Sequence, residues 1–280
     1  MTTSETAGRR RAAAVLSRAA SQPDRLWRRV TAGRRPLPDF IILGAQRAGT
    51  TSLYNWITSH PSVAPAKQKE VHYFDLHYAK GANWYRAHFP LARAGQVTGE
   101  ASPYLLFHPL APGRAAADLP PSTTFIVILR DPVERAVSHY WHERRLKAET
   151  ESLAVALALE EERLSGEDER VLGGERSFAH FHFSYAARGR YAEQLERWFA
   201  HVGRSRVLVV ESESLFGDPE AQIRVTDWLG LSDSPGPFPA MNEAQRVDPA
   251  DPAAVRMLER YFDPLNEELF ELLGHRLWGR

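Results

Sequence analysis

The sequence of 280 residues contains 35 Lys and Arg against 35 Asp and Glu, and it has no cysteine. Its 43% hydrophobic and 25% charged residues are typical of a globular protein and exclude a largely disordered or collagenous chain. Without cysteine, the sequence offers no disulfide framework, thiolate metal site, iron–sulfur cluster or cysteine nucleophile. The neutral total gives no reason to expect bulk binding to nucleic acid.

The positive charge is concentrated at the N-terminus. Residues 1–35 contain nine arginines and two acids, a surplus of seven positive charges, and the rest of the chain carries the opposite balance. We therefore divide the chain into a basic, flexible arm (1–36) and a single domain (37–280). No run of the sequence approaches the roughly 18–20 apolar residues of a transmembrane helix.

The arm opens at Arg9–Arg11 like a twin-arginine export signal. Its apolar stretch, Ala12–Leu16, has only five residues, and a signal needs about 7–15, so we do not expect export. The simplest interpretation is a solvated or loosely helical tail. The alternative is a weak electrostatic hold on an anionic membrane surface or an acidic partner. Its apolar side would come from Val15, Leu16, Leu26, Trp27 and Val30.

Beyond the arm, short apolar runs alternate with helical patterns. Phe40–Leu43, Phe125–Leu129 and Val207–Val210 predict buried strands. Continuous apolar strands that alternate with helices predict a parallel sheet covered on both faces. The expected fold is therefore α/β, a three-layer P-loop-like sandwich. The segment 146–188, rich in Ala and Glu, predicts a helical and loop insertion, which we expect near the ligand-binding cleft.

A glycine-framed loop, Gly44–Ser52, follows the first predicted strand and opens a helix. Its glycines allow backbone N–H groups to point at an anion, and the helix N-terminus adds positive potential. Arg47 adds a fixed cation, and hydroxyl donors come from Thr50, Thr51 and Ser52. The alternative is a capped strand-to-helix turn that needs no ligand.

The loop differs from the ATP-binding pattern G-x-x-x-x-G-K-[ST] because Thr50 stands at the lysine position. The strand Phe125–Leu129 is followed by Arg130, whereas a Walker B strand ends in an acid that holds magnesium. These differences favour anion handling without a metal. The histidine pairs at 139 and 142 and at 180 and 182 are not expected to hold zinc.

A second anion-binding element follows that strand. Asp131, Pro132 and Glu134 suit the N-cap, N1 and N3 positions of a helix with a capping box. Arg130 lies at the carboxyl end of a strand, where open α/β sheets bind ligands, and Ser138 lies about two turns into the helix. The two side chains could hold a second phosphate. The alternative is a helix start with a salt bridge at the strand end.

Five segments resemble, in the same order, those of sulfotransferases that use 3′-phosphoadenylyl sulfate (PAPS). Gly44–Leu53 is similar to their 5′-phosphosulfate loop, and Ile128–Ser138 is similar to their 3′-phosphate motif. Lys69–Asp75 resembles the segment that carries the catalytic glutamate in the heparan-sulfate (N- and 3-O-) branch. Gly99–Tyr104 and Gly189–Trp198 also resemble parts of that branch.

The resemblance implies a metal-free, in-line transfer of a sulfuryl group from PAPS to an acceptor. Glu70 is expected to take the acceptor proton, with His72 in support or as the alternative base. Arg47 and the main chain of Ala48 and Gly49 would stabilise the leaving phosphate. The other residues expected to contact the nucleotide are Thr50, Thr51, Ser52, Arg130, Ser138, Tyr191 and, more weakly, Arg246.

Two of these assignments have plain alternatives. Glu70 could be a surface acid paired with Lys67 or Lys69, and Tyr191 could simply pack at a helix start. Many relatives have lysine where this chain has Arg47, and arginine is too weak an acid to protonate a leaving group. We therefore expect Arg47 to act by charge and hydrogen bonding.

The expected acceptor is a hydroxyl, or less readily an amine, of a carbohydrate, glycolipid or small natural product. Two other functions remain open: a P-loop nucleotide phosphotransferase, and a non-catalytic module that binds the nucleotide. The expected compartment is the cytoplasm, where the donor is made.

Overall fold

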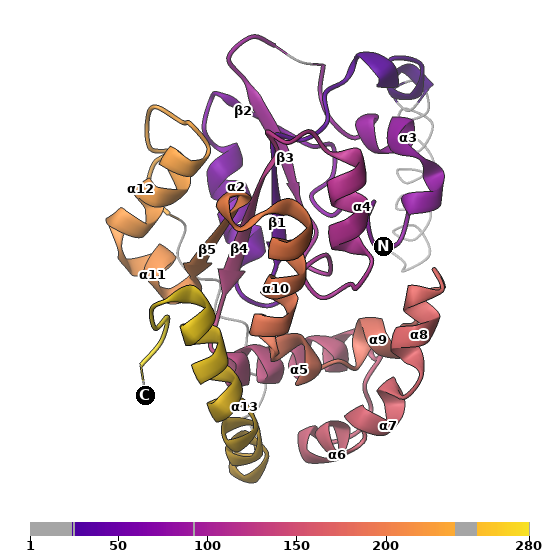
Figure 1. Cartoon of the computed structure of the whole chain (residues 1–280), viewed down its shortest axis with the longest axis vertical. Helices are drawn as coiled ribbons and strands as arrows, with labels where there is room; N and C mark the ends of the chain where they lie inside the picture. The colour runs from indigo at the N-terminus through magenta and orange to yellow at the C-terminus, as the bar shows by residue number, and fades with distance from the viewer. Residues whose placement is uncertain (1–23, 25, 92, 239–250, 280) are drawn as a thin grey trace, which may run out of the picture.

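The computed structural model describes residues 24, 26–91, 93–238 and 251–279. At its centre is a five-stranded sheet in the order β2-β3-β1-β4-β5, with every neighbouring pair parallel (Figure 1). The strands are β1 (Phe40–Gly44), β2 (Val63–Pro65), β3 (Val97–Ala101), β4 (Thr124–Leu129) and β5 (Val207–Glu211). The α/β prediction is confirmed, and β1, β4 and β5 coincide with the three predicted strands to within one residue at each end.

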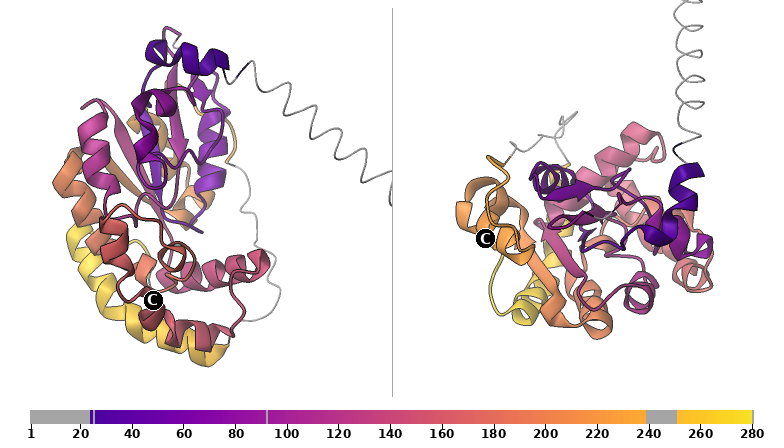
Figure 2. Two further views of the ribbon diagram at one scale, coloured as in Figure 1. Left: turned by 90° about the vertical axis from the view of Figure 1, so that its right-hand side faces the viewer. Right: turned by 90° about the horizontal axis from the view of Figure 1, so that it is seen from above.

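Helices cover both faces of this sheet. The helices α4 (Ala111–Asp118) and α10 (Tyr191–Val202) lie together on one face, where Phe125 of β4 meets Trp198 at a ring distance of 5.3 Å. The helix α2 (Thr50–Thr58) lies on the other face (Figure 2). Every residue of β1 is buried, which explains its uninterrupted apolar run.

The sequence did not reveal β2 and β3. The edge strand β2 has three residues and ends in Pro65, and proline is largely confined to sheet edges. The strand β3 carries Thr98, Gly99 and Glu100 instead of an apolar run. Its glycine is required by packing, since an added Cβ would lie 2.5 Å from the ring of Phe40. Such constraints come from the neighbouring strand and leave no local hydrophobic signal.

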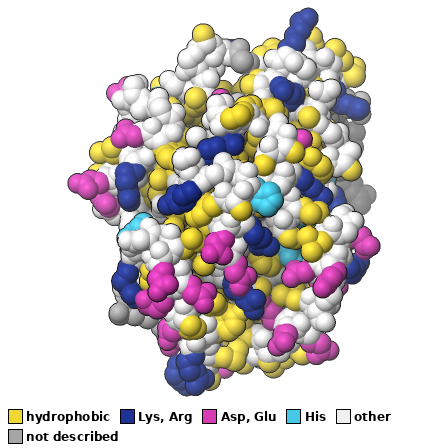
Figure 3. Space-filling view, in the orientation of Figure 1, with side chains coloured by type: hydrophobic (Ala, Val, Ile, Leu, Met, Phe, Trp, Pro, Cys, Tyr) yellow, Lys and Arg dark blue, Asp and Glu magenta, His cyan; other side chains and the backbone are white. Residues whose placement is uncertain are grey.

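A second helical group lies beyond the carboxyl ends of the strands. It contains α5 (Pro132–Leu146) and α13 (Pro252–Leu273), which share a separate apolar cluster with α6 (Leu153–Ala158). The predicted insertion forms α6, α7 (Glu160–Leu164), α8 (Glu167–Leu172) and α9 (Phe178–His182). On the face seen in Figure 3, acidic side chains gather over this lower half, whereas basic side chains are spread more widely.

Except for α12 (Pro219–Trp228), the remaining elements are short. They are η1 (Ala32–Arg34), η2 (Tyr78–Lys80), α3 (Ala82–Arg86), η3 (Ala187–Gly189), η4 (Arg204–Arg206), α11 (Ser212–Gly217) and α12 (Pro219–Trp228). None of the described helices is long and apolar enough to cross a membrane.

The part of the predicted arm that the structure describes packs onto the domain. Asp24 and residues 26–30 are helical, and Arg35 is 4% exposed and donates to the carbonyl of Phe89 over 2.7 Å. The boundary predicted at residue 36 is therefore too late for this stretch. A buried hydrogen bond made by Arg35 and partly buried ones made by Arg28 fix it, and their role could not be read from a count of charges. Residues 1–23 lie outside the described residues.

Candidate active site

The loop between β1 and α2 has the backbone geometry expected of an anion cradle. Gly49 is the N-cap of α2 at a φ of 100°, a left-handed conformation that favours glycine. No described side chain caps this helix, so its first N–H groups face the loop without a protein acceptor. Arg47 also has a positive φ, 71°, a strained conformation of the kind that concentrates at functional sites.

Arg47 links this loop to α5. Its Nε donates to the Oγ of Ser138 over 3.1 Å, which joins the two sequence-predicted anion elements. Burial lowers the pKa of Arg47, and the nearby cations Arg145 and Arg130 lower it further. Among the described residues, no carboxylate lies within ion-pair distance of Arg47. An anion bound here would relieve this repulsion, so the geometry favours a negatively charged ligand.

Arg130 follows β4 as predicted, and in this structure carboxylates surround it. Its Nε donates to Glu134 over 3.0 Å and lies 3.6 Å from a carboxylate oxygen of Glu213. Asp131 caps α5 by accepting from two main-chain N–H groups, as predicted. A phosphate held by Arg130 would compete with these two exposed carboxylates for the guanidinium.

Tyr191 contacts the main chain of Arg130. The ring is 1% exposed, and its hydroxyl donates to the carbonyl oxygen of Arg130 over 3.0 Å. This position agrees better with packing at a helix start than with stacking on a nucleotide. Its contact with the nucleotide stays a prediction, and Arg246 lies outside the described residues. We call the loop 44–52, Arg130 and Ser138 the donor half of the site.

Glu70, His72 and Asp75 form what we call the base half. The Nδ1 of His72 lies 2.7 Å from Asp75, and its Nε2 lies 3.4 Å from Glu70. Burial would lower the pKa of His72, but its hydrogen bonds to Asp75 and Glu70 outweigh this effect and raise the pKa to about 10. The imidazole is therefore a cation at neutral pH.

The same contacts keep Glu70 ionised. Burial would raise its pKa, but hydrogen bonds from His72 and Lys69 lower it to about 2. Of the two lysines predicted as alternative partners of Glu70, Lys69 pairs with it, since Lys69 Nζ lies 2.7 Å from its carboxylate. Lys67 pairs with Asp24 instead. Glu70 keeps 45% of its side chain exposed, so pairing with Lys69 and His72 leaves it accessible to an acceptor.

The end of β3 holds the backbone of the base half. Glu100 is fully buried and accepts hydrogen bonds from Val71 N (3.2 Å), Tyr85 Oη (2.7 Å) and Ser102 Oγ (2.6 Å). The same Ser102 Oγ accepts from the N–H of His72 over 3.1 Å. This support fixes His72 at its positive φ of 55°.

His142 and Arg145 of α5, to which the sequence assigned no part in proton transfer or nucleotide binding, interact electrostatically with residues of the site. His142 interacts electrostatically with both Arg47 and Glu70, and burial, followed by Arg47, lowers its pKa, so it is neutral. Arg145 interacts with Arg47 and His142. Both positions follow Ser138 at helical spacing, four and seven residues on, which places them on the same face of α5. That periodicity was the available signal.

Arg188 connects the loop to the insertion. It is 3% exposed, donates to the side chain of Gln46, and donates to the carbonyl of Phe181 in α9 over 2.7 Å. Its guanidinium also lies 4.8 Å from the ring centre of Tyr104. Burial lowers its pKa to about 10, which leaves it charged. Arg188 therefore fixes Gln46, the residue before Arg47, against α9.

An aromatic group that the sequence did not reveal borders the loop. Phe216 lies 3.5 Å from where a Cβ on Gly49 would stand. Its ring lies 5.0 Å from that of Phe238, which in turn lies 5.1 Å from Trp56. The ring planes are inclined at 83° and 44°, so the three side chains form an aromatic cluster beside the loop.

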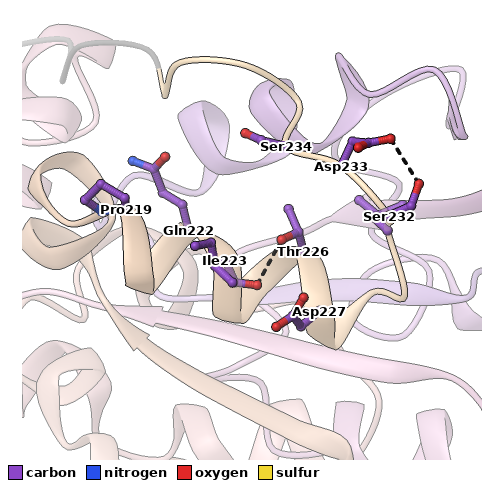
Figure 4. A pocket seen from close by; sticks show the side chains of 9 residues that line it. Pro219, Gln222, Ile223, Thr226, Asp227, Ser232, Asp233 and Ser234 are labelled. Atoms are coloured by element: carbon purple, nitrogen blue, oxygen red, sulfur yellow. Dashed lines mark hydrogen bonds between the residues drawn. The ribbon is translucent and has the colours of Figure 1, made fainter.

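A separate hollow of about 300 Å³ lies against α12, lined by Gln222, Ile223, Thr226, Asp227 and the turn 231–234 (Figure 4). It contains no cation to hold phosphate, so we do not assign the donor to it. No group of three or more His, Asp or Glu among the described residues could hold a metal ion.

A parallel sheet with a glycine-framed anion loop after β1, an arginine after β4 and a paired carboxylate opposite defines a nucleotide-dependent group transferase with a P-loop-like fold. The chain belongs to the sulfotransferase family: the profile described as Sulfotransferase domain matches residues 37–244. The protein is a PAPS-dependent sulfotransferase.

The individual relatives agree with this assignment. Human heparan sulfate glucosamine 3-O-sulfotransferase 6 is 30% identical over 88% of this chain and 75% of its own length. The membrane-associated sulfotransferase kil1 of Dictyostelium discoideum is 25% identical over 85% of this chain and 65% of its own length. The crystal structure of a sulfotransferase from Alicyclobacillus acidocaldarius superposes with a TM-score of 0.67 at 27% identity, covering 86% of this chain and 98% of the other.

Proposed function

We propose that this sulfotransferase acts on a hydroxyl group of a carbohydrate, with Glu70 as the base. The observation that carries the base assignment is its position: an accessible, ionised carboxylate shares the neighbour His142 with Arg47. The carbohydrate acceptor is supported by relatives named as heparan sulfate glucosamine sulfotransferases. Aromatic side chains of the acceptor side, such as Phe181, suit contact with a sugar face.

In the proposed step, the acceptor oxygen forms a bond to sulfur while the bond from sulfur to the phosphate oxygen of the donor breaks. The acceptor proton passes to Glu70, and the electron pair of the broken bond stays on the departing phosphate. Arg47 and the N–H groups at the start of α2 stabilise that negative charge. Arg130 and Ser138 bind the 3′-phosphate and so select this nucleotide.

The protonated state of His72 assigns it a supporting role. A histidine whose pKa is about 10 has no free lone pair for a proton at neutral pH. His72 instead orients the carboxylate of Glu70 and supplies a positive charge beside it. Because Glu70 is a weak base, the acceptor proton must become acidic as the bond to sulfur forms. Proton transfer then accompanies bond formation and does not precede it.

Transfer of labelled sulfate from PAPS to a panel of carbohydrates, in the presence of a magnesium chelator, tests this proposal. We expect turnover on at least one hydroxylated sugar without magnesium. Transfer only to amines or phenols would contradict the acceptor assignment. Magnesium-dependent phosphate transfer from ATP would instead support the phosphotransferase alternative.

We also propose that the protein works in the cytoplasm, with a weak electrostatic contact between its basic arm and an anionic membrane. The surplus of seven positive charges in residues 1–35 supports the contact. Cell fractionation at increasing salt tests both statements. We expect the protein in the cytoplasmic fraction, with any membrane-bound part released by salt.

A further inference from the structure

The short helix before η1 has its polar and apolar sides reversed. Arg28 points inward and donates to the carbonyls of Ala87 (3.4 Å) and Phe89 (3.3 Å). Asp24 accepts from Arg28 over 3.0 Å and also pairs with Lys67. The charged side chains of this helix are therefore used to attach it to the domain.

Its apolar side chains point to solvent. Leu26, Trp27 and Val30 are 65%, 57% and 74% exposed, and we call these three residues the apolar stripe. Arg29 and Arg34 are exposed as well: at 100° per residue Arg29 lies beside Leu26 at the edge of the stripe, and Arg34 follows the helix in η1. A helix that turns Arg28 toward the domain and displays a leucine, a tryptophan and a valine to solvent favours an apolar partner at that surface.

The charges around the stripe decide which partner fits. No acid occurs between residues 26 and 35, so a second copy packed symmetrically on the stripe would bring arginine against arginine. The N-terminal segment of the chain itself is a poor cover for the same reason, since residues 1–23 contain four arginines and only Glu5. Apolar side chains flanked by arginines match an anionic lipid surface, in which Trp favours the interface.

We propose that the apolar stripe docks into the headgroup region of an anionic membrane, with Arg29 and Arg34 on lipid phosphates. This deepens the proposed contact of the basic arm but depends on the described helix alone. The helix would lie in the plane of the surface, because no described helix can cross a bilayer. It lies toward one end of the long axis of the molecule and α5 toward the other, so the proposed membrane contact is away from α5 (Figures 1 and 2).

Co-sedimentation of the full chain with vesicles tests the proposal. The vesicles consist of phosphatidylcholine, with or without the anionic lipid phosphatidylglycerol. The test variant carries three changes: Leu26→Ser, Trp27→Ser and Val30→Ser. The control variant is Ile223→Ser. Ile223 is 54% exposed on α12, far along the sequence from the stripe. We expect the wild type and the control to bind the anionic vesicles, and the triple variant to bind at least about tenfold more weakly.

Three outcomes would overturn the proposal. The first is no binding of the wild type to anionic vesicles. The second is undiminished binding by the triple variant. If a variant with Arg9, Arg10 and Arg11 changed to Gln loses vesicle binding instead, the binding belongs to the arm and not to the stripe. The third is a dimer, seen by light scattering, that the triple change dissociates. Sedimentation needs no turnover, so failure of this proposal is separate from failure of the proposed reaction. Unchanged affinity of the triple variant for 3′-phosphoadenosine 5′-phosphate (PAP), the product nucleotide, shows that the variant is folded.

Discussion

In the donor half, the main chain and hydroxyl groups surround Arg47, and no described carboxylate pairs with it. In the base half, every charge has a partner: Asp75 holds His72, and His72 with Lys69 holds Glu70. At Arg47 the donor half can thus receive charge from a ligand, whereas its second cation, Arg130, is paired with Glu134 and Glu213. The base half fixes the charge of its own groups. Substitutions in the two halves should therefore change different measured quantities.

The largest effect is expected from Glu70→Gln. This change removes the proton acceptor while keeping the shape of the side chain, and we expect kcat to fall by about 10²–10⁴. The exposed acid Glu161, changed to Gln, is the matched control. Steady-state turnover with labelled donor measures both variants. A loss below about tenfold would remove Glu70 from the role of base.

Arg47→Ala should lower kcat by about 10² or more, because one donor to a developing oxyanion is typically worth that much. Arg47→Lys should recover part of the rate by restoring the charge, although it lacks the fork that reaches Ser138. Single-turnover rates at saturating donor measure this. Full activity of the alanine variant would contradict the role of Arg47 in the donor half.

A change in pH dependence is expected from His72→Gln. In the wild type, the pKa of Glu70 is about 2, so its ionisation limits activity only in strong acid; loss of the His72 proton limits it as the pH rises through about 10. Without the His72 cation, the pKa of Glu70 rises toward its ordinary value, and the acid limb of the kcat profile moves to higher pH. An unchanged acid limb would show that His72 does not set the charge of Glu70.

The smallest effect is expected from Arg188→Lys, which keeps the charge but loses the fork between Gln46 and α9. We expect kcat to fall several-fold with little change in PAP affinity. A double-mutant cycle with Gln46→Ala isolates the pair, and the two losses should not add. Fully additive losses would show that Arg188 acts independently of Gln46, which would contradict the proposed link.

The sequence predicted those parts of the molecule that have a local signature. The all-apolar strands β1, β4 and β5 and the anion elements beside β1 and β4 were found because burial and helix capping are read from neighbouring residues. The strands β2 and β3 were missed because an edge position and the close approach of Gly99 to Phe40 decide their residues.

The site shows the same division. Glu70 and His72 could be placed by resemblance, but the charge of His72 depends on Asp75 and on burial, which require the fold. His142 had a helical spacing that could have been used. Arg188 and Gln46 are 142 residues apart, and no pattern in either segment predicts their contact.

The affinity for 3′-phosphoadenosine 5′-phosphate (PAP), measured by titration calorimetry, tests the division of the site most directly. We predict that Glu70→Gln binds PAP within about twofold of the wild type, because the base half does not hold the nucleotide. Ser138→Ala should bind about 10–100-fold more weakly, since it loses a hydrogen bond to a charged phosphate. Wild-type affinity in Ser138→Ala, or loss of PAP binding in Glu70→Gln, would contradict the account.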